Sequence, residues 1–306
     1  MKLVTASARP ARERSHAATR LGAAGLVVMS AFSAQLGAAY AFGLFRLTSP
    51  TMTAWIRNLV GAAVLMALLL ARRGSWRSLD LRLALAMGIV LGGMNATFYE
   101  GLLRLPLGDG VAIEFAGPIV VAAVTASSRR HLVWVALAAA GVFAISRPGP
   151  THLNYVGMAF MLAAATFWGT YVLLGRRIAT GGRRSDTLAL AMVFAAVCLT
   201  LPALARSAGT LTDPRVLALG ALVGVLSSAI PYSIELMAMA RVPPAIFGVL
   251  LSLQPLSAAL IGLVILRQRV SLLEFAGFCL VVAASLGVTF AAAPAESRAE
   301  GELLPT

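Results

Sequence analysis

The sequence contains little charge, and especially little acid. Only 12% of the 306 residues are charged, and the 12 Asp and Glu are outnumbered by 25 Lys and Arg. Soluble globular proteins carry about 25% charged residues, roughly twice this share. No stretch is polar enough for a sizeable water-soluble domain, so the sequence excludes that class of protein.

Residues typical of metal and catalytic sites are also scarce. The two cysteines, Cys198 and Cys279, lie in separate apolar runs without CxxC spacing, which predicts inert core thiols and no disulfide or metal. The three histidines, His16, His131 and His152, fall in polar segments between the runs. Neither an HExxH nor a Walker A sequence is present. We therefore expect neither an enzyme nor a cofactor.

Apolar residues, by contrast, are abundant. They make up 59% of the chain, and the mean hydropathy is +0.86. Runs of about 20 apolar residues, the length that crosses about 30 Å of hydrocarbon, follow one another along the sequence. They predict an all-α integral membrane protein of about ten transmembrane helices. The expected spans are residues 21–44, 51–71, 82–103, 106–127, 131–147, 153–175, 186–205, 215–240, 243–266 and 271–292.

The net charge of +13 would suggest nucleic acid as a partner if the protein were soluble. Here the basic residues separate the apolar runs, and most of them gather in alternate connections. By the positive-inside rule, this bias predicts a multi-pass protein of the cell (inner or plasma) membrane with both termini cytoplasmic. Residues 1–20 are predicted to be a disordered basic tail and residues 293–306 a second short tail.

An internal repeat divides the chain. The segment RLPLGDGVAIEFAGP begins at Arg104 and RVPPAIFGVLLSLQP at Arg241, and three identities recur at a constant offset of 137 residues. They are Arg104 with Arg241, Pro106 with Pro243 and Pro118 with Pro255. The offset places the fourth span on the ninth, so residues 21–148 and 153–292 form two five-helix repeats. Because five is odd, the repeats must be inverted, an architecture of secondary transporters with alternating access.

Glu114 is the most informative charge within a span, because charged side chains inside a membrane are costly. Pro118, four residues later, cannot donate to the carbonyl of residue 114 and should bend the helix there. A carboxylate and a freed carbonyl at one depth suit a polar cavity. Glu114 is thus a candidate proton carrier, or else one half of a structural ion pair with Arg57, which could also snorkel outward or meet a substrate carboxylate.

Other polar side chains occur at similar depths. Glu235 follows Pro231 and Tyr232 in the eighth span, and Gln254 stands beside Pro255 in the ninth. Glu235 either lines a cavity or is structural, and Gln254 either helps to orient a zwitterion or packs between helices. Further candidates for the cavity are Gln35, Asn95, Tyr99, Trp168, Tyr171 and Tyr232, although Trp and Tyr also populate membrane interfaces. The spacings Gly88–Gly92 and Gly220–Gly224 predict close helix packing.

Two stretches carry a family resemblance. GGMNATFYEGLLRLPLGDGVAIEFAGP from Gly92 and PYSIELMAMARVPPAIFGVLLSLQP from Pro231 resemble the threonine/homoserine exporters of the EamA-domain branch of the drug/metabolite transporter superfamily. The resemblance implies ten helices in two inverted repeats, and a cavity lined by spans 1, 3, 4, 6, 8 and 9. It also implies export of small neutral amino acids, coupled to the proton gradient. Glu114, Glu235, Asn95 and Tyr99 match residues of the family motifs.

The sequence departs from that family at two places. Gln254 stands where the family often has Glu, and Arg267–Gln268 where it has Gly-Glu. These departures leave the coupling ion and the substrate open. An exporter of other metabolites or drugs on the same fold is the alternative, followed by a membrane enzyme or non-transporting scaffold. The last would need catalytic pairs or large docking domains, for which the sequence offers no signal.

Overall fold

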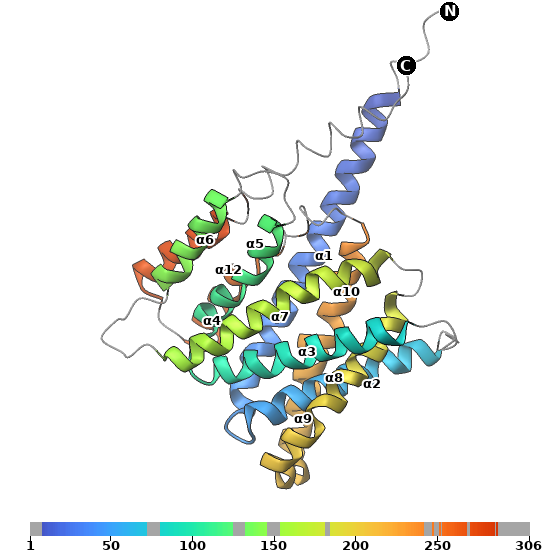
Figure 1. Ribbon diagram of the computed structural model, residues 1–306, viewed down its shortest axis with the longest axis vertical. Coiled ribbons are helices and arrows are strands. Elements are labelled where there is room, and N and C mark those ends of the chain that lie inside the picture. Colours follow the sequence, from blue (N-terminus) through green and yellow to red (C-terminus); the bar gives the residue numbers. More distant parts are fainter. Residues whose placement is uncertain are drawn as a thin grey trace, which may run out of the picture.

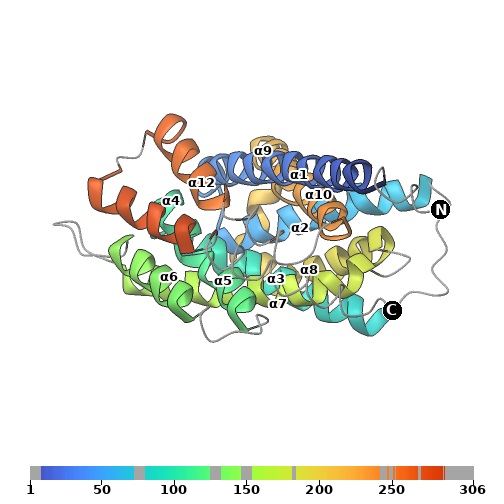
Figure 2. The ribbon, with the colours of Figure 1, turned by 90° about the horizontal axis from the view of Figure 1, so that it is seen from above.

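The computed structural model of the chain describes residues 8–71, 80–124, 132–145, 154–180, 184–241, 253–267 and 270–284, with the single residues 247, 251 and 286. Within these ranges all regular structure is helical, which confirms the predicted all-α class. Seen from above, α1, α9, α10 and α12 lie on one side of the molecule and α3, α6 and α7 on the other, with α2 between them (Figure 2).

Six stretches of the described residues are long and apolar enough to cross a membrane. They match six of the ten expected spans, because each combines about 20 apolar residues with almost no charge. Figure 1 labels the helices that contain them. They belong to α1 (Ala8–Leu44), α2 (Pro50–Ala71), α3 (Leu81–Leu102), α7 (Tyr155–Thr180), α8 (Arg184–Ser207, continued by the 3₁₀ turn η3, Ala208–Thr212), and the run α9 (Pro214–Gly224), η4 (Val225–Ala229) and α10 (Ile230–Met239).

The other four expected spans correspond to shorter helices within the described residues. The fourth is two helices, α4 (Leu107–Glu114) and α5 (Ala116–Val124). The fifth is α6 (Leu132–Ile145), the ninth contains α12 (Leu253–Val264), and the tenth contains a helix over Leu272–Ala284. The count of ten spans therefore stays a prediction.

Two expectations about individual segments were wrong. The first helix begins at Ala8, so most of the segment predicted to be a disordered tail is helical. Cys198 and Cys279 were expected in the core, but both side chains are exposed on the outer surface of their helices. A helix that is apolar on every side carries no pattern that separates its packed face from its lipid face. The tail at 293–306 lies outside the described residues.

The helices pack through small residues. Gly88 of α3 faces α8, where a Cβ would come within 2.7 Å of the Ala191 carbonyl oxygen, and Gly92 faces Ala195 one turn on. Gly220 and Gly224 of α9 face Ile56 and Val60 of α2 in the same way. Both glycine pairs thus allow close helix contacts, as their spacing predicts.

Packing follows a regular scheme across the bundle. Helix α2 contacts α8, and α4 contacts α12. Helix α3 packs on both α7 and α8, while the run α9–η4–α10 packs on both α1 and α2. Helices α4 and α5 pack on α7, and α12 packs on α1. The polar residues considered below lie where these contacts converge.

Candidate functional site

The first element of the site is a helix interrupted inside the bundle. Helix α4 ends at Glu114, Phe115 caps it, and α5 begins at Ala116. Pro118 in the first turn of α5 has no N–H for the Glu114 carbonyl, so the helix breaks where the sequence predicts. Gly117 allows α5 to approach α7, because a Cβ there would collide with the Ala165 carbonyl.

The second element is a π-helical turn, η4, which ends two residues before Pro231. Pro231 cannot donate to the Ser227 carbonyl four residues earlier, and that carbonyl instead accepts a hydrogen bond from Nη2 of Arg57. One residue before, the Leu226 carbonyl accepts from the Ser33 hydroxyl of α1 at 2.7 Å. Single π turns inside α-helices often mark functional positions.

Arg57 of α2 is 6% exposed and is surrounded by neutral groups. Its Nε donates to Ser228 Oγ at 2.8 Å, its Nη1 to Tyr99 Oη at 3.4 Å and its Nη2 to Tyr232 Oη at 3.1 Å. The guanidinium also lies over both tyrosine rings, 5.5 and 5.7 Å from their centroids, within the range of cation–π attraction. The ion pair with Glu114 that the sequence suggested is not formed among the described residues, because Pro231 supplies Arg57 with a free carbonyl.

Asn95 of α3 connects the two halves of the bundle. Its Oδ1 accepts from Tyr232 Oη at 3.1 Å, and its Nδ2 donates to Asn58 Oδ1 at 2.7 Å. All three side chains are buried. The network therefore fixes the position of the Tyr232 hydroxyl, which also accepts from Arg57.

Glu235 of α10 is 4% exposed and receives three hydrogen bonds. Tyr171 Oη donates to Oε2 at 3.0 Å, Ser30 Oγ to Oε1 at 3.1 Å, and Gln254 Nε2 to Oε1 at 3.4 Å. Gln254 in turn accepts from Gln35 Nε2 at 2.8 Å. Because every partner donates, the shell around Glu235 matches an ionised carboxylate.

Glu114 is the opposite case. It is 7% exposed, yet among the residues that the structure describes none donates a hydrogen bond to its carboxylate or pairs with it as an ion. The ring of Phe115, the next residue, packs edge to face with that of Trp168, which lines the same cavity, at a centroid distance of 5.6 Å. A buried carboxyl group without partners is costly unless it exchanges a proton or meets a ligand.

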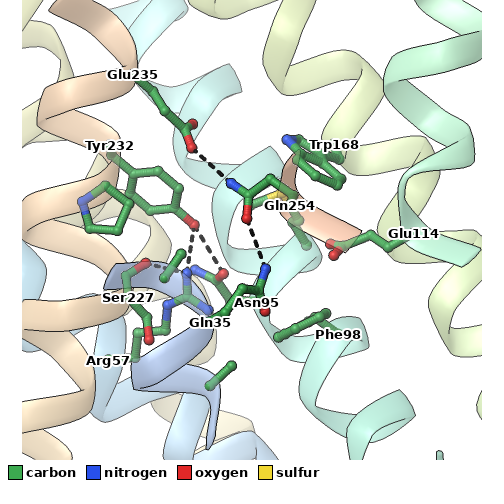
Figure 3. A pocket seen from close by; sticks show the side chains of 14 residues that line it. Gln35, Arg57, Asn95, Phe98, Glu114, Trp168, Ser227, Tyr232, Glu235 and Gln254 are labelled. Atoms are coloured by element: carbon green, nitrogen blue, oxygen red, sulfur yellow. Dashed lines mark hydrogen bonds between the residues drawn. The ribbon is translucent and has the colours of Figure 1, made fainter. Parts of the chain in front are cut away.

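These side chains surround one internal cavity of about 60 Å³, room for several water-sized groups. Arg57, Ser227 and Tyr232 lie on one side of it, and Glu114, Trp168 and Phe98 on the other (Figure 3). The lining residues come from expected spans 1, 3, 4, 6, 8 and 9, and in addition from α2, which contributes Arg57. The lining residues are Ala34, Gln35, Ala38, Arg57, Met94, Asn95, Phe98, Glu114, Trp168, Ser227, Pro231, Tyr232, Glu235 and Gln254.

Not every candidate residue faces the cavity. Tyr99 and Tyr171 stand behind it and hold Arg57 and Glu235. Pro255, which the sequence offers as a further helix break, lies two residues after the first described residue of α12, so that break stays a prediction. Ser227 and Ser228 escaped the sequence analysis, although the rule that identified Glu114 before Pro118 also identifies Ser227 before Pro231.

Glu100 belongs to a separate cluster at the end of α3. Its carboxylate pairs with Arg104 at 2.8 Å and with Arg206 at 3.5 Å, and it accepts from Thr51 Oγ1 at 3.3 Å. The cluster joins the start of α2 to the ends of α3 and α8. We attribute a structural role to it.

Broken helices around a buried polar cavity, in a bundle of apolar helices, define a multi-pass membrane protein of the transporter class. The sequence pattern of the EamA-like transporter family matches residues 155–290. Curated relatives extend the match to most of the chain, so the protein belongs to the EamA-like transporter family of the drug/metabolite transporter superfamily. It is accordingly not classed with enzymes.

The relatives are similar over nearly their whole length. The threonine/homoserine exporter RhtA of Salmonella typhimurium (strain LT2) is 34% identical over 267 residues, which cover 86% of this chain and 89% of the relative. The protein of the same name from Escherichia coli (strain K12) is 34% identical over 268 residues, covering 86% and 90%. A chain of known crystal structure shares the fold with a TM-score of 0.59 at 18% identity, over 88% of this chain and 98% of that one.

Proposed function

We propose that this protein exports small neutral amino acids such as threonine and homoserine across the cell membrane, coupled to protons, by alternating access. The substrate class comes from the relatives, which are named threonine/homoserine exporters and match most of the chain. The observation that carries the coupling is Glu114, a buried carboxyl group that lines the cavity and has no partner among the described residues.

The packing scheme supports two inverted repeats. In such repeats α1 corresponds to α7, α2 to α8, α3 to the α9–α10 run and α4 to α12. When each helix is exchanged for its counterpart, the contacts of α3 with α7 become those of the α9–α10 run with α1. The contacts of α2 with α8 and of α4 with α12 map onto themselves. An approximate two-fold relation between the halves accounts for this exchange.

One hydrogen bond supports an axis of this two-fold relation close to the cavity. Asn95 and Tyr232 are 137 residues apart, the offset of the sequence repeat, and their side chains touch. Two residues related by a two-fold axis meet only close to that axis. The axis would therefore pass beside the cavity, where a rocking motion of the halves exposes a bound substrate to either side in turn.

The proposed orientation in the membrane puts both termini in the cytoplasm. The basic residues Arg176 and Arg177 at the end of α7, and Arg241 after α10, then lie on the cytoplasmic side, as the positive-inside rule requires. The cluster of Glu100 with Arg104 and Arg206 lies on the outer side. Substrate would enter from the cytoplasm and leave outward, against the inward flow of protons.

The test is accumulation of radiolabelled threonine and homoserine in inverted membrane vesicles, with and without a proton gradient. We expect gradient-dependent accumulation in the wild type, its loss in Glu114→Gln, and its retention in Glu100→Gln, which makes the same chemical change outside the cavity. Gradient-driven transport by Glu114→Gln at the wild-type rate would remove Glu114 from the mechanism.

The alternative substrate class is other metabolites or drugs. Met94, Phe98 and Trp168 give the cavity an apolar wall that would also fit a less polar compound. If neither amino acid moves although the purified protein is folded, the assignment passes to this class.

A further inference from the structure

Several polar groups of residues that line the cavity have no partner among the described residues. The Oε1 atom of Gln35 and the Oγ atom of Ser227 are buried and make no hydrogen bond, although the two residues are only 6% and 1% exposed. Glu114 likewise has none. Buried polar groups are paired in the great majority of cases, so unpaired ones that line a cavity point to a ligand.

These groups differ in chemistry between the two sides of the cavity. Arg57 uses four of its five N–H groups on Ser227, Ser228, Tyr99 and Tyr232, which leaves one N–H on Nη1 without a partner in the described part of the chain. That N–H and the neighbouring Ser227 hydroxyl can both donate. Glu114, on the opposite side in Figure 3, only accepts when it is ionised, and Gln35 Oε1 accepts as well.

From this arrangement we infer that the cavity binds its substrate as a zwitterion in one fixed orientation. The carboxylate of the substrate faces Arg57 and Ser227, and its ammonium group faces Glu114 and Gln35. The inference deepens the proposed function and rests on it, because it assigns the two charged ends of an amino acid to named residues. It predicts recognition of the α-amino-acid backbone and not of one side chain.

The glutamine pair explains why Gln35 accepts rather than donates to the ligand. Its Nε2 donates to Gln254 Oε1 at 2.8 Å, and Gln254 Nε2 donates onward to Glu235. The ionised Glu235 thereby orients both amides, and the amide oxygen of Gln35 is left over. Glu235 and Gln254 act as positioning residues for this acceptor.

The experiment measures ligand-induced thermal stabilisation of the purified protein, from which apparent dissociation constants follow. Three ligands are compared: L-threonine, its methyl ester, which lacks the carboxylate, and 2,3-dihydroxybutanoate, which has a hydroxyl group in place of the ammonium. In the wild type we expect both analogues to bind about tenfold or more weakly than threonine, which corresponds to about 1.4 kcal/mol or more.

Two variants then separate the two ends of the ligand. Glu114→Gln should weaken threonine about tenfold and leave 2,3-dihydroxybutanoate unchanged, since that ligand has no ammonium group. Ser227→Ala, which removes a hydroxyl without a partner and so should fold normally, should weaken threonine and 2,3-dihydroxybutanoate but not the ester. Glu100→Gln is the matched control and should leave all three constants unchanged.

The possible failures are distinguishable. If threonine binds but each variant weakens all three ligands equally, or if the wild type binds the ester as well as threonine, the orientation is wrong and amino-acid export stands. If no small neutral amino acid stabilises the folded wild type, the proposed function fails and the orientation fails with it.

Discussion

Glu114 and Glu235 line the same cavity and are almost equally buried, yet their surroundings have little in common. Glu235 receives hydrogen bonds from Tyr171, Ser30 and Gln254, which come from three different helices. Glu114 stands at a helix break and has no partner among the described residues. The comparison teaches that burial alone does not define the role of an acid within the membrane.

The shell of donors around Glu235 keeps its charge in place, where it helps to balance Arg57. A carboxylate with three donors is stabilised in its ionised form, so Glu235 is suited to a permanent charge. Glu114 has no hydrogen-bond donor among the described residues that would hold it in the ionised form, so a proton or a ligand can change its state. We therefore assign the fixed role to Glu235 and the exchangeable role to Glu114.

The largest expected effect is on stability in Glu235→Gln. An amide at this position must point its N–H₂ at the hydroxyl of Tyr171 or Ser30, both of which donate to the carboxylate now. Losing a hydrogen bond to a charged group costs about 2 kcal/mol. Thermal unfolding in detergent should show this loss for Glu235→Gln and little change for Glu114→Gln. Equal losses in the two variants would erase the distinction between the acids.

A second effect concerns the helix break that presents Glu114. In Pro118→Ala an N–H becomes available for the Glu114 carbonyl, so α4 can continue into α5 and turn the carboxylate away from the cavity. We expect export to fall about tenfold, about 1.4 kcal/mol in the barrier, without loss of stability. Pro202→Ala in α8, a proline outside the cavity lining, is the control. An equal fall in the export rate of both variants would mean that the effect is not specific to the helix break at Glu114.

A smaller effect on stability is expected when one hydrogen-bond donor to Glu235 is removed. Tyr171→Phe removes one of its three donors and should cost about 1 kcal/mol of stability. Tyr155→Phe, at the exposed start of α7, should cost nothing measurable. Unfolding of the two variants side by side measures the difference. If Tyr171→Phe left the free energy of unfolding unchanged, the fixed role of Glu235 would be contradicted.

The smallest effect is expected outside the cavity. Cys198 is exposed on α8, so Cys198→Ser should change stability by no more than about 0.5 kcal/mol. In Cys279→Ser, which removes the other exposed thiol, a thiol reagent that partitions into the membrane should label Cys198 without affecting export. Loss of export on labelling would place this face of α8 in an interface and not toward lipid.

The sequence predicts the helices well because length and apolarity alone decide them. It also predicts the break after Glu114, since a proline acts on the carbonyl four residues before it wherever it occurs. The inward faces are harder to predict: Cys198 was expected in the core and Ser227 was overlooked. In an apolar helix neither periodicity nor composition shows which side packs.

The partners of Arg57 were also beyond the sequence. An arginine and a glutamate at similar depth suggest an ion pair, but whether they meet depends on how α2, α4 and the α9–α10 run pack together. Here the Ser227 carbonyl, which lacks its helix partner because of Pro231, takes the place expected for Glu114. Only the tertiary arrangement separates these two outcomes.

The most direct test of the exchangeable role of Glu114 is proton movement coupled to threonine flux. Purified protein is reconstituted into liposomes that contain a pH-sensitive dye, and a threonine gradient is imposed without a proton gradient. The account predicts that threonine flux drives protons in the opposite direction in the wild type and in Glu100→Gln, and that this movement is absent in Glu114→Gln. Threonine-driven proton movement in Glu114→Gln, at the wild-type ratio of protons to threonine, would contradict it.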